Sequence, residues 1–226
     1  MRKNKRALLQ LLLQFLLVLL PAFSVAVSAQ SAATPRAKPA TAAAPNIVVY
    51  GDSLSAGYGL RQGAGWPTLL QERLKQNKFN YNVVNASISG ETSAGGAARI
   101  AVTMRDARPA VLVVALGAND GLRGLPVAQL RDNLGAIVKA AKGGNSKVVI
   151  AGMRMPPNYG PKYTEQFQRS FADLAKEQRL ALVPFLLEGV AQRPELFQQD
   201  QLHPTEEAQQ LILENVWKSL EPLLKK

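Results

Sequence analysis

Short, unbroken apolar runs alternate with segments of helical length from residue 46 onward, and few folds accommodate this order. The clearest run covers residues 111–116, where Val, Leu and Ala follow one another without a polar residue. A strand with this pattern is typically buried on both faces, as in a parallel sheet. Parallel neighbours are joined by helical crossovers, so the alternation predicts a doubly wound α/β sandwich.

The same pattern places the individual elements. Strands are predicted at 47–50, 82–85, 110–116, 147–151 and 181–184, and helices at about 65–77, 92–107, 126–142 and 162–178. A last helix is predicted over 205–220, because Pro204 and Thr205 can begin it and Glu206 and Glu207 suit its first turn. In such folds the working residues lie at the carboxyl ends of the strands.

Residues 1–29 have the pattern of a secretory signal peptide. Basic residues within positions 2–6 precede an apolar segment at 7–20, and the small residues at 27–29 suit a cleavage site. The alternative is an uncleaved membrane anchor, since residues 7–29 carry no charge. Residues 30–45 are rich in Ala, Pro, Thr and Ser, which is typical of a flexible linker. We therefore expect one exported domain over 46–226, in the periplasm or secreted.

The formal net charge of +11 comes largely from these N-terminal segments. Of 27 Lys and Arg residues, four lie in the predicted signal and two in the linker, which leaves the domain 21 against 16 Asp and Glu, a net charge of +5. No dense basic cluster with interleaved aromatic residues is present, so no nucleic-acid partner is expected. Membrane contact is expected only through an uncleaved signal, and the domain is expected to be a monomer.

Two facts of composition restrict the chemistry. The chain contains no Cys and one His, His203. Disulfides and thiol nucleophiles are thereby excluded, and a catalytic zinc site, which usually has two or more His ligands, is disfavoured. We expect no metal and no cofactor, and any step that needs an imidazole must use His203.

A nucleophile is predicted directly after the first strand, in Gly51-Asp52-Ser53-Leu54-Ser55. A Gly followed by a Ser at the carboxyl end of a strand can expose the Ser hydroxyl. The pattern is not the G-x-S-x-G elbow of α/β-hydrolases, because Ser55 stands at the second Gly. Ser53 could instead be the N-cap of a helix.

The single histidine stands in Asp200-Gln201-Leu202-His203-Pro204. A carboxylate three residues before the His can orient the ring and stabilise the imidazolium that forms when the ring accepts a proton. The alternative is a surface His near the start of a helix, with Asp200 as an ordinary loop residue.

Hydrogen-bond donors for an oxyanion are predicted at the ends of two further strands. Gly90 follows the second strand and Asn119 follows the third. A backbone N–H and a side-chain amide can both stabilise the oxyanion of a tetrahedral intermediate. Each residue also has a purely structural explanation, as a loop-to-helix turn at Gly90 and as a turn at Asn119.

These blocks occur together and in a recognisable order. Gly51-Asp-Ser-Leu, Gly90, Gly117-Ala-Asn-Asp and Asp200-x-x-His203 resemble the four motif blocks of the SGNH, or GDSL, hydrolase family. The resemblance extends from about residue 46 to 222 and is strongest to the multifunctional bacterial thioesterase, protease and lysophospholipase type of arylesterase. It implies the family's three-layer α/β/α sandwich, with a five-stranded parallel, flavodoxin-like sheet.

The resemblance also implies residue roles. Ser53 would be the nucleophile, His203 the general base and Asp200 its orienting carboxylate, with an oxyanion hole formed by the N–H groups of Ser53 and Gly90 and the side chain of Asn119. Gln201 and Gln199 depart from the family pattern, in which a small residue and a second acid are common at these positions. Neither departure affects a triad residue.

The substrate is less closely defined. Apolar residues at the carboxyl ends of strands could line an acyl groove: Leu122, Leu125, Met153, Met155, Pro156 and Pro157. Ordinary loop packing would also explain them. The resemblance implies a serine esterase or thioesterase that hydrolyses acyl esters, thioesters or lysophospholipids through an acyl-enzyme. A carbohydrate acetyl-esterase with the same triad and a non-catalytic lipid-binding α/β module are the alternatives.

Overall fold

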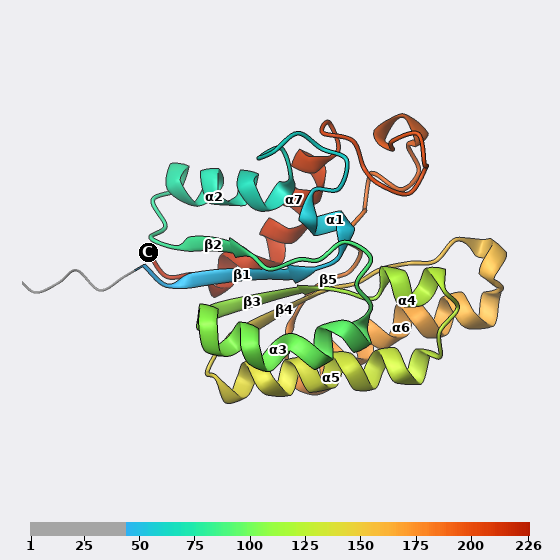
Figure 1. The fold of residues 1–226 in the computed structure, drawn as a ribbon, viewed down its shortest axis with the longest axis horizontal. Helices are drawn as coiled ribbons and strands as arrows, with labels where there is room; N and C mark the ends of the chain where they lie inside the picture. Colours follow the sequence, from blue (N-terminus) through green and yellow to red (C-terminus); the bar gives the residue numbers. More distant parts are fainter. Residues whose placement is uncertain (1–43) are drawn as a thin grey trace, which may run out of the picture. The chain divides into compact units, whose positions relative to one another are not determined.

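A five-stranded, fully parallel sheet forms the centre of the domain, in the order β2-β1-β3-β4-β5 (Figure 1). The computed structural model describes residues 44–226, so the predicted signal peptide and nearly all of the predicted linker lie outside the described residues. The strands are β1 Asn46–Gly51, β2 Asn82–Asn85, β3 Pro109–Ala115, β4 Lys147–Ala151 and β5 Ala181–Val183. The predicted parallel sheet is confirmed.

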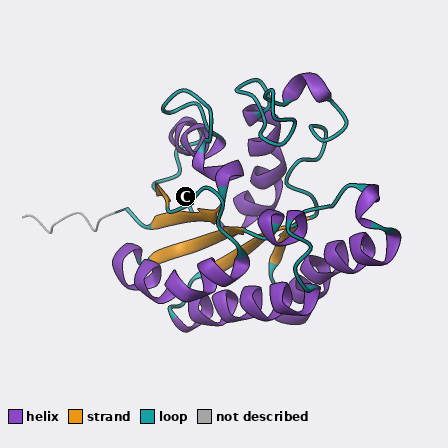
Figure 2. Ribbon diagram, turned by 45° about the vertical axis from the view of Figure 1, so that its right-hand side comes forward, coloured by secondary structure: helices purple, strands orange, loops and turns teal. Residues whose placement is uncertain are grey.

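Helices cover both faces of this sheet. Figure 1 shows α2 (Trp66–Gln76) and α7 (Gln209–Leu220) together on one side, and α3 (Ser93–Ala107), α5 (Val127–Gly143) and α6 (Pro161–Gln178) on the other. Two short helices, α1 (Ser53–Ala56) and α4 (Ala118–Leu122), directly follow β1 and β3. Figure 2 shows the same three layers with the strands between the helices. The three-layer α/β/α sandwich is confirmed.

The core is centred on β1 and β3. Residues 47–50 and 111–114 are at most 1 % exposed, and Val48 lies beside Leu112 in the parallel register. Two large rings from the flanking layers, Trp66 and Phe167, are fully buried against this centre. Complete burial of one such apolar side chain stabilises the folded state by about 1.5–3 kcal/mol. The two central strands are therefore a rigid base for whatever follows their carboxyl ends.

The order in which the strands are added to the sheet reverses at β1. β2 pairs with one edge of β1 and β3 with the other, which gives the order of flavodoxin-like sheets and a topological switch point between β1 and β3. Loops that leave neighbouring strands in opposite directions open a crevice at this point. Ser53 in α1 and Asn119 in α4 stand at its two sides.

The last helix begins later than predicted. α7 starts at Gln209 instead of Thr205, because the preceding residues make other contacts. Thr205 donates its N–H to the Leu196 carbonyl, Pro204 forms a bridge with Phe197, and the Glu206 carboxylate accepts hydrogen bonds from Arg61. Tertiary contacts thus replace the first helical turn that the sequence pattern favours.

No helix within residues 44–226 combines the length and the apolar character needed to cross a bilayer.

Candidate active site

The turn after β1 is shaped by two residues that precede Ser53. A Cβ at Gly51 would lie 2.8 Å from the Ser55 Oγ and 3.0 Å from the Ala115 carbonyl, so only glycine fits there. Asp52 is the N-cap of α1, and its Oδ1 accepts the Leu54 N–H at 3.0 Å. Ser53 is therefore the first residue of the helix and not its cap, which leaves its hydroxyl free for other partners.

That hydroxyl begins a chain of hydrogen bonds. Ser53 Oγ lies 2.9 Å from His203 Nε2, and His203 Nδ1 lies 2.6 Å from Asp200 Oδ2. The hydrogen bond from the ring and two backbone N–H donors lower the pKa of Asp200 to about 2, so this carboxylate is ionised near neutral pH. An ionised carboxylate only accepts, which assigns the proton to Nδ1 of a neutral ring and leaves Nε2 to accept from Ser53.

Hydrogen bonds within the loop that carries His203 fix the conformation of this loop. Asp200 Oδ1 accepts the N–H groups of Leu202 (2.9 Å) and His203 (3.0 Å), and the backbone N–H of Gln198 donates to the His203 carbonyl at 2.8 Å. Gln201 has a left-handed backbone with φ +56°. A residue with a Cβ adopts this conformation less readily than glycine, so the hydrogen bonds of the loop hold Gln201 in it.

The two predicted oxyanion donors are joined to each other by α4. Asn119 Nδ2 donates to the Glu91 carbonyl at 3.0 Å, and Arg123, at the end of α4, donates to the Gly90 carbonyl at 3.0 Å. Gly90 has φ +79°, so its conformation favours glycine. Ser53, Asn119 and His203 line one cavity, whereas Gly90 is exposed beside them. The turn of α4 thus holds two consecutive carbonyls of the Gly90 loop.

Two buried carboxyl groups support this arrangement. Asp52 is 1 % exposed, and burial raises its pKa to about 7. Asp120 is 2 % exposed and accepts from the backbone N–H (2.8 Å) and hydroxyl (2.5 Å) of Ser93. Asn133 donates to the same hydroxyl at 3.0 Å. These bonds fix the start of α3 to α4, and thereby the Gly90 loop to the segment that carries Asn119.

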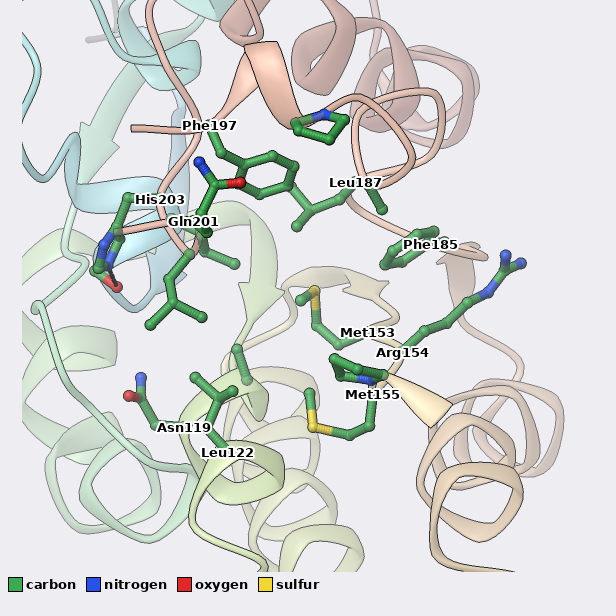
Figure 3. Close-up of a pocket in the computed structure, with 17 residues that line it drawn as sticks. Asn119, Leu122, Met153, Arg154, Met155, Phe185, Leu187, Phe197, Gln201 and His203 are labelled. Carbon is green, nitrogen blue, oxygen red and sulfur yellow. Dashed lines mark hydrogen bonds between the residues drawn. The ribbon is translucent and has the colours of Figure 1, made fainter. Parts of the chain in front are cut away.

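An apolar cavity of about 340 Å³ opens beside Ser53 and His203 (Figure 3). Its lining consists of Ser53, Leu54, Ala118, Asn119, Leu122, Met153, Arg154, Met155, Pro156, Phe185, Leu187, Ala191, Pro194, Phe197, Gln201, Leu202 and His203. Figure 3 shows Asn119 and His203 on one side of the cavity and Phe185 on the opposite side. An apolar cavity next to a polar hydrogen-bonded chain is the usual form of a small-molecule site.

The structure places most of the predicted groove residues in this wall. Leu122, Met153, Met155 and Pro156 line the cavity, whereas Leu125 and Pro157 are absent from its lining. The Leu125 carbonyl accepts the Tyr163 hydroxyl at 2.9 Å, which holds this residue in the connection after α4.

Several wall residues lie where the sequence offered no signal. Phe185, Leu187, Pro194 and Phe197 come from the irregular segment between β5 and α7, which has no periodic pattern. The residues Asp52, Asp120 and Arg123 were also missed, although each lies within four residues of a predicted site residue. Their role depends on hydrogen bonds to distant segments, which local patterns do not encode.

Comparisons with known proteins agree with this geometry. The model of the GDSL-like lipase/acylhydrolase family matches residues 49–211. The esterase TesA of Pseudomonas aeruginosa is 49 % identical over 183 residues, which cover 81 % of this chain and 91 % of the relative. The thioesterase 1/protease 1/lysophospholipase L1 of Escherichia coli K12 is 40 % identical over 183 residues, 81 % of this chain and 86 % of the relative.

A solved structure supports the same relationship. The crystal structure of TesA superposes with a TM-score of 0.77 at 48 % identity, covering 79 % of this chain and 99 % of that chain. The family match spans most of the described residues and includes every motif block on which the resemblance rests. The protein therefore belongs to the GDSL-like lipase/acylhydrolase family.

Proposed function

We propose that the protein is a serine carboxylic ester hydrolase that acts through an acyl-enzyme. One observation carries the proposal: the continuous hydrogen-bonded chain from Ser53 through His203 to Asp200, at the mouth of an apolar cavity. A hydroxyl, a neutral imidazole and an ionised carboxylate in this order are what nucleophilic attack on an acyl carbonyl requires. Relatives named esterase, arylesterase and thioesterase/lysophospholipase support the same reading.

The geometry supports a role for each residue in turn. His203 takes the Ser53 proton through Nε2 as Ser53 Oγ attacks the ester or thioester carbonyl, and Asp200 stabilises the imidazolium that results. The N–H groups of Ser53 and Gly90 and the Asn119 amide stabilise the oxyanion. The protonated His203 then gives its proton to the leaving alcohol or thiol. Water, deprotonated by His203, hydrolyses the acyl-enzyme and restores Ser53.

The cavity favours esters and thioesters with medium to long acyl chains, including lysophospholipids. Leu122, Met155 and Phe185 offer the acyl chain apolar contacts, and burial of each methylene group contributes about 0.8 kcal/mol. An acetyl group would leave most of this wall in contact with water, which disfavours the alternative of a carbohydrate acetyl-esterase.

A series of chromogenic esters, from acetyl to long acyl groups, tests the proposal. The wild type should hydrolyse them with kcat/KM rising from acetyl toward longer chains, and Ser53→Ala should lose turnover while retaining its fold. Turnover confined to the acetyl ester would favour the carbohydrate acetyl-esterase. Absence of turnover with every ester would favour a lipid-binding module instead.

We infer that residues 1–29 direct export and are removed, so that the enzyme works in the periplasm or outside the cell. We also infer that the domain is a monomer. Mass spectrometry of the exported protein would test the removal directly: a mass that begins at Gln30 supports cleavage, and a full-length mass supports an anchor. Light scattering of the purified domain would test the monomer.

A further inference from the structure

Large apolar side chains gather around the mouth of the cavity. Five such side chains are exposed in the part of the chain that the structure describes: Tyr58 (53 %), Ile88 (50 %), Val102 (49 %), Leu122 (38 %) and Leu202 (50 %). Four of them, all except Val102 in the middle of α3, adjoin the active site. We call these four, Tyr58, Ile88, Leu122 and Leu202, the apolar rim.

Each member of the apolar rim is tied to the site by a contact. Leu122 and Leu202 line the cavity, and the Tyr58 ring packs on the His203 ring with their centroids 4.4 Å apart. Ile88 donates its N–H to the Gly51 carbonyl at 3.0 Å, which places it beside the end of β1. The four residues come from four different loops or short helices, so no single sequence pattern brings them together.

This exposure needs an explanation that ordinary surface composition does not give. Isolated apolar residues on a surface are common, whereas a group around one opening usually marks a binding surface. Leu122 and Leu202 line the cavity, so an acyl chain that enters it would contact them. Ile88 and Tyr58 lie outside the cavity wall, so an acyl chain within the cavity leaves them in water. A binding partner that covers all four residues of the apolar rim must therefore be larger than the acyl group itself.

We propose that the apolar rim docks on the surface of an anionic lipid aggregate that contains single-chain amphiphiles, such as lysophospholipids, and draws the substrate from it. This inference rests on the proposed function, because the rim surrounds the mouth through which the ester must reach Ser53. Contact between the rim and the aggregate lets the acyl chain pass from one apolar environment to another without crossing water.

Charge favours an anionic aggregate over a neutral one. Residues 46–226 carry 21 Lys and Arg against 16 Asp and Glu, an excess of positive charge. Arg123, next to Leu122 of the rim, is exposed and directs its guanidinium to a carbonyl and not to a carboxylate. The net charge of the domain attracts an anionic surface at long range, and Arg123 is a cation beside the rim itself, which adds to the short-range apolar contact.

Ile88 and Val102 form a matched pair for the test, since their exposures are nearly equal and neither lines the cavity. In a Ser53→Ala background, which removes turnover, flotation with phosphatidylglycerol vesicles containing lysophosphatidylglycerol measures docking alone. Ile88→Asp should lower the partition of the protein onto vesicles on the order of tenfold, and Val102→Asp should leave it within about twofold. Both changes add the same charge, so the difference reports position.

The inference would be overturned if the Ser53→Ala protein failed to float with the vesicles, or if the Ile88→Asp and Val102→Asp proteins lost docking equally. The proposed function is judged separately, with Ser53 intact, by hydrolysis of a soluble short-chain ester. Ile88→Asp should keep that hydrolysis within about twofold of the wild type, and a parallel loss would also overturn the docking role. Absence of soluble-ester turnover in the wild type would instead contradict the proposed function.

Discussion

At the level of single residues, Arg123 stands out because it joins the two halves of the oxyanion site. Its guanidinium holds the Gly90 carbonyl, and its own backbone N–H bonds to the Asn119 carbonyl at 3.2 Å. Arg123 contacts no reacting atom in the proposed mechanism, so its role is to position Gly90 relative to Asn119. Small displacements of positioned donors can lower rates substantially.

We therefore expect Arg123→Gln to lower kcat about 10- to 100-fold with little change in KM, because the binding cavity is untouched. Arg123→Lys should recover part of the loss, since an ammonium group can still donate to a carbonyl. Arg105→Gln, which removes an exposed arginine paired with Asp106, is the control and should leave kcat unchanged. Steady-state kinetics on a soluble ester would decide, and equal effects at both positions would contradict the positioning role.

Asn119→Ala tests the oxyanion donor itself. Loss of one donor typically lowers kcat about 10²–10³-fold, and the variant should remain folded because the Asn119 side chain is only partly buried. Steady-state rates and a thermal unfolding curve on the same preparation would separate catalysis from stability. Wild-type turnover in a folded Asn119→Ala protein would remove this residue from the proposed mechanism.

Asp52 makes the stability depend on pH. Burial raises the pKa of its carboxyl from 3.8 to about 7, so the unfolded chain ionises at a lower pH than the folded protein. The folded state is then penalised as pH rises from about 4 to 7, by on the order of 4 kcal/mol at completion. Asp52→Asn should flatten this part of the stability profile. Urea unfolding between pH 4 and 8 would measure it, and parallel profiles for the two proteins would contradict the prediction.

At the level of elements, what the sequence could predict depended on length and burial. The strand β4 begins and ends where its apolar run predicts, because buried strands need continuous apolar residues. The half-exposed strand β2 also has its predicted bounds. The short helices α1 and α4 could not be predicted, since four or five residues show no periodicity. The late start of α7 follows from the bonds of Thr205 and Glu206 to distant segments, which outweigh a local preference for a helix.

The residues of the candidate site also differ in how far the sequence could predict them. The candidate site residues Ser53, Gly90, Asn119, Asp200 and His203 could be predicted because each stands in a short motif at the end of an element. The wall of the cavity could be identified only in part. Phe185 and Phe197 belong to a long irregular connection whose path is set by packing, so no local pattern separates wall residues such as these from ordinary loop residues.

The close packing of the turn from β1 into α1 can be tested by adding one methyl group at Gly51. Gly51→Ala would place a Cβ within 3.0 Å of Ser55 and Ala115, and such overpacking typically costs about 1–3 kcal/mol. Gly135→Ala in α5 is the control, since nothing lies within 4 Å of its Cβ. The control should stabilise the protein by about 0.5–1 kcal/mol, as alanine favours a helix. Chemical denaturation gives both values, and a neutral Gly51→Ala would contradict the close packing of this turn.

At the level of the whole molecule, the site stands at the switch point of the sheet, where α1 and α4 leave the two most buried strands. The rigid centre positions Ser53 and Asn119, while the long connection after β5 supplies His203 and much of the cavity wall. This division predicts that substitutions of the wall residues between Phe185 and Phe197 change substrate preference more readily than they change the chemistry of the triad.

The bond between Ser53 and His203 joins residues 150 positions apart. It closes a loop that contains all of the sheet except the first strand, so its native geometry depends on the placement of the four enclosed strands as well as of β1. Recovered ester hydrolysis is therefore a late signal of refolding, which should trail the recovery of secondary structure. A fragment that ends before residue 203 would be silent in such an assay, however much of its sheet had assembled.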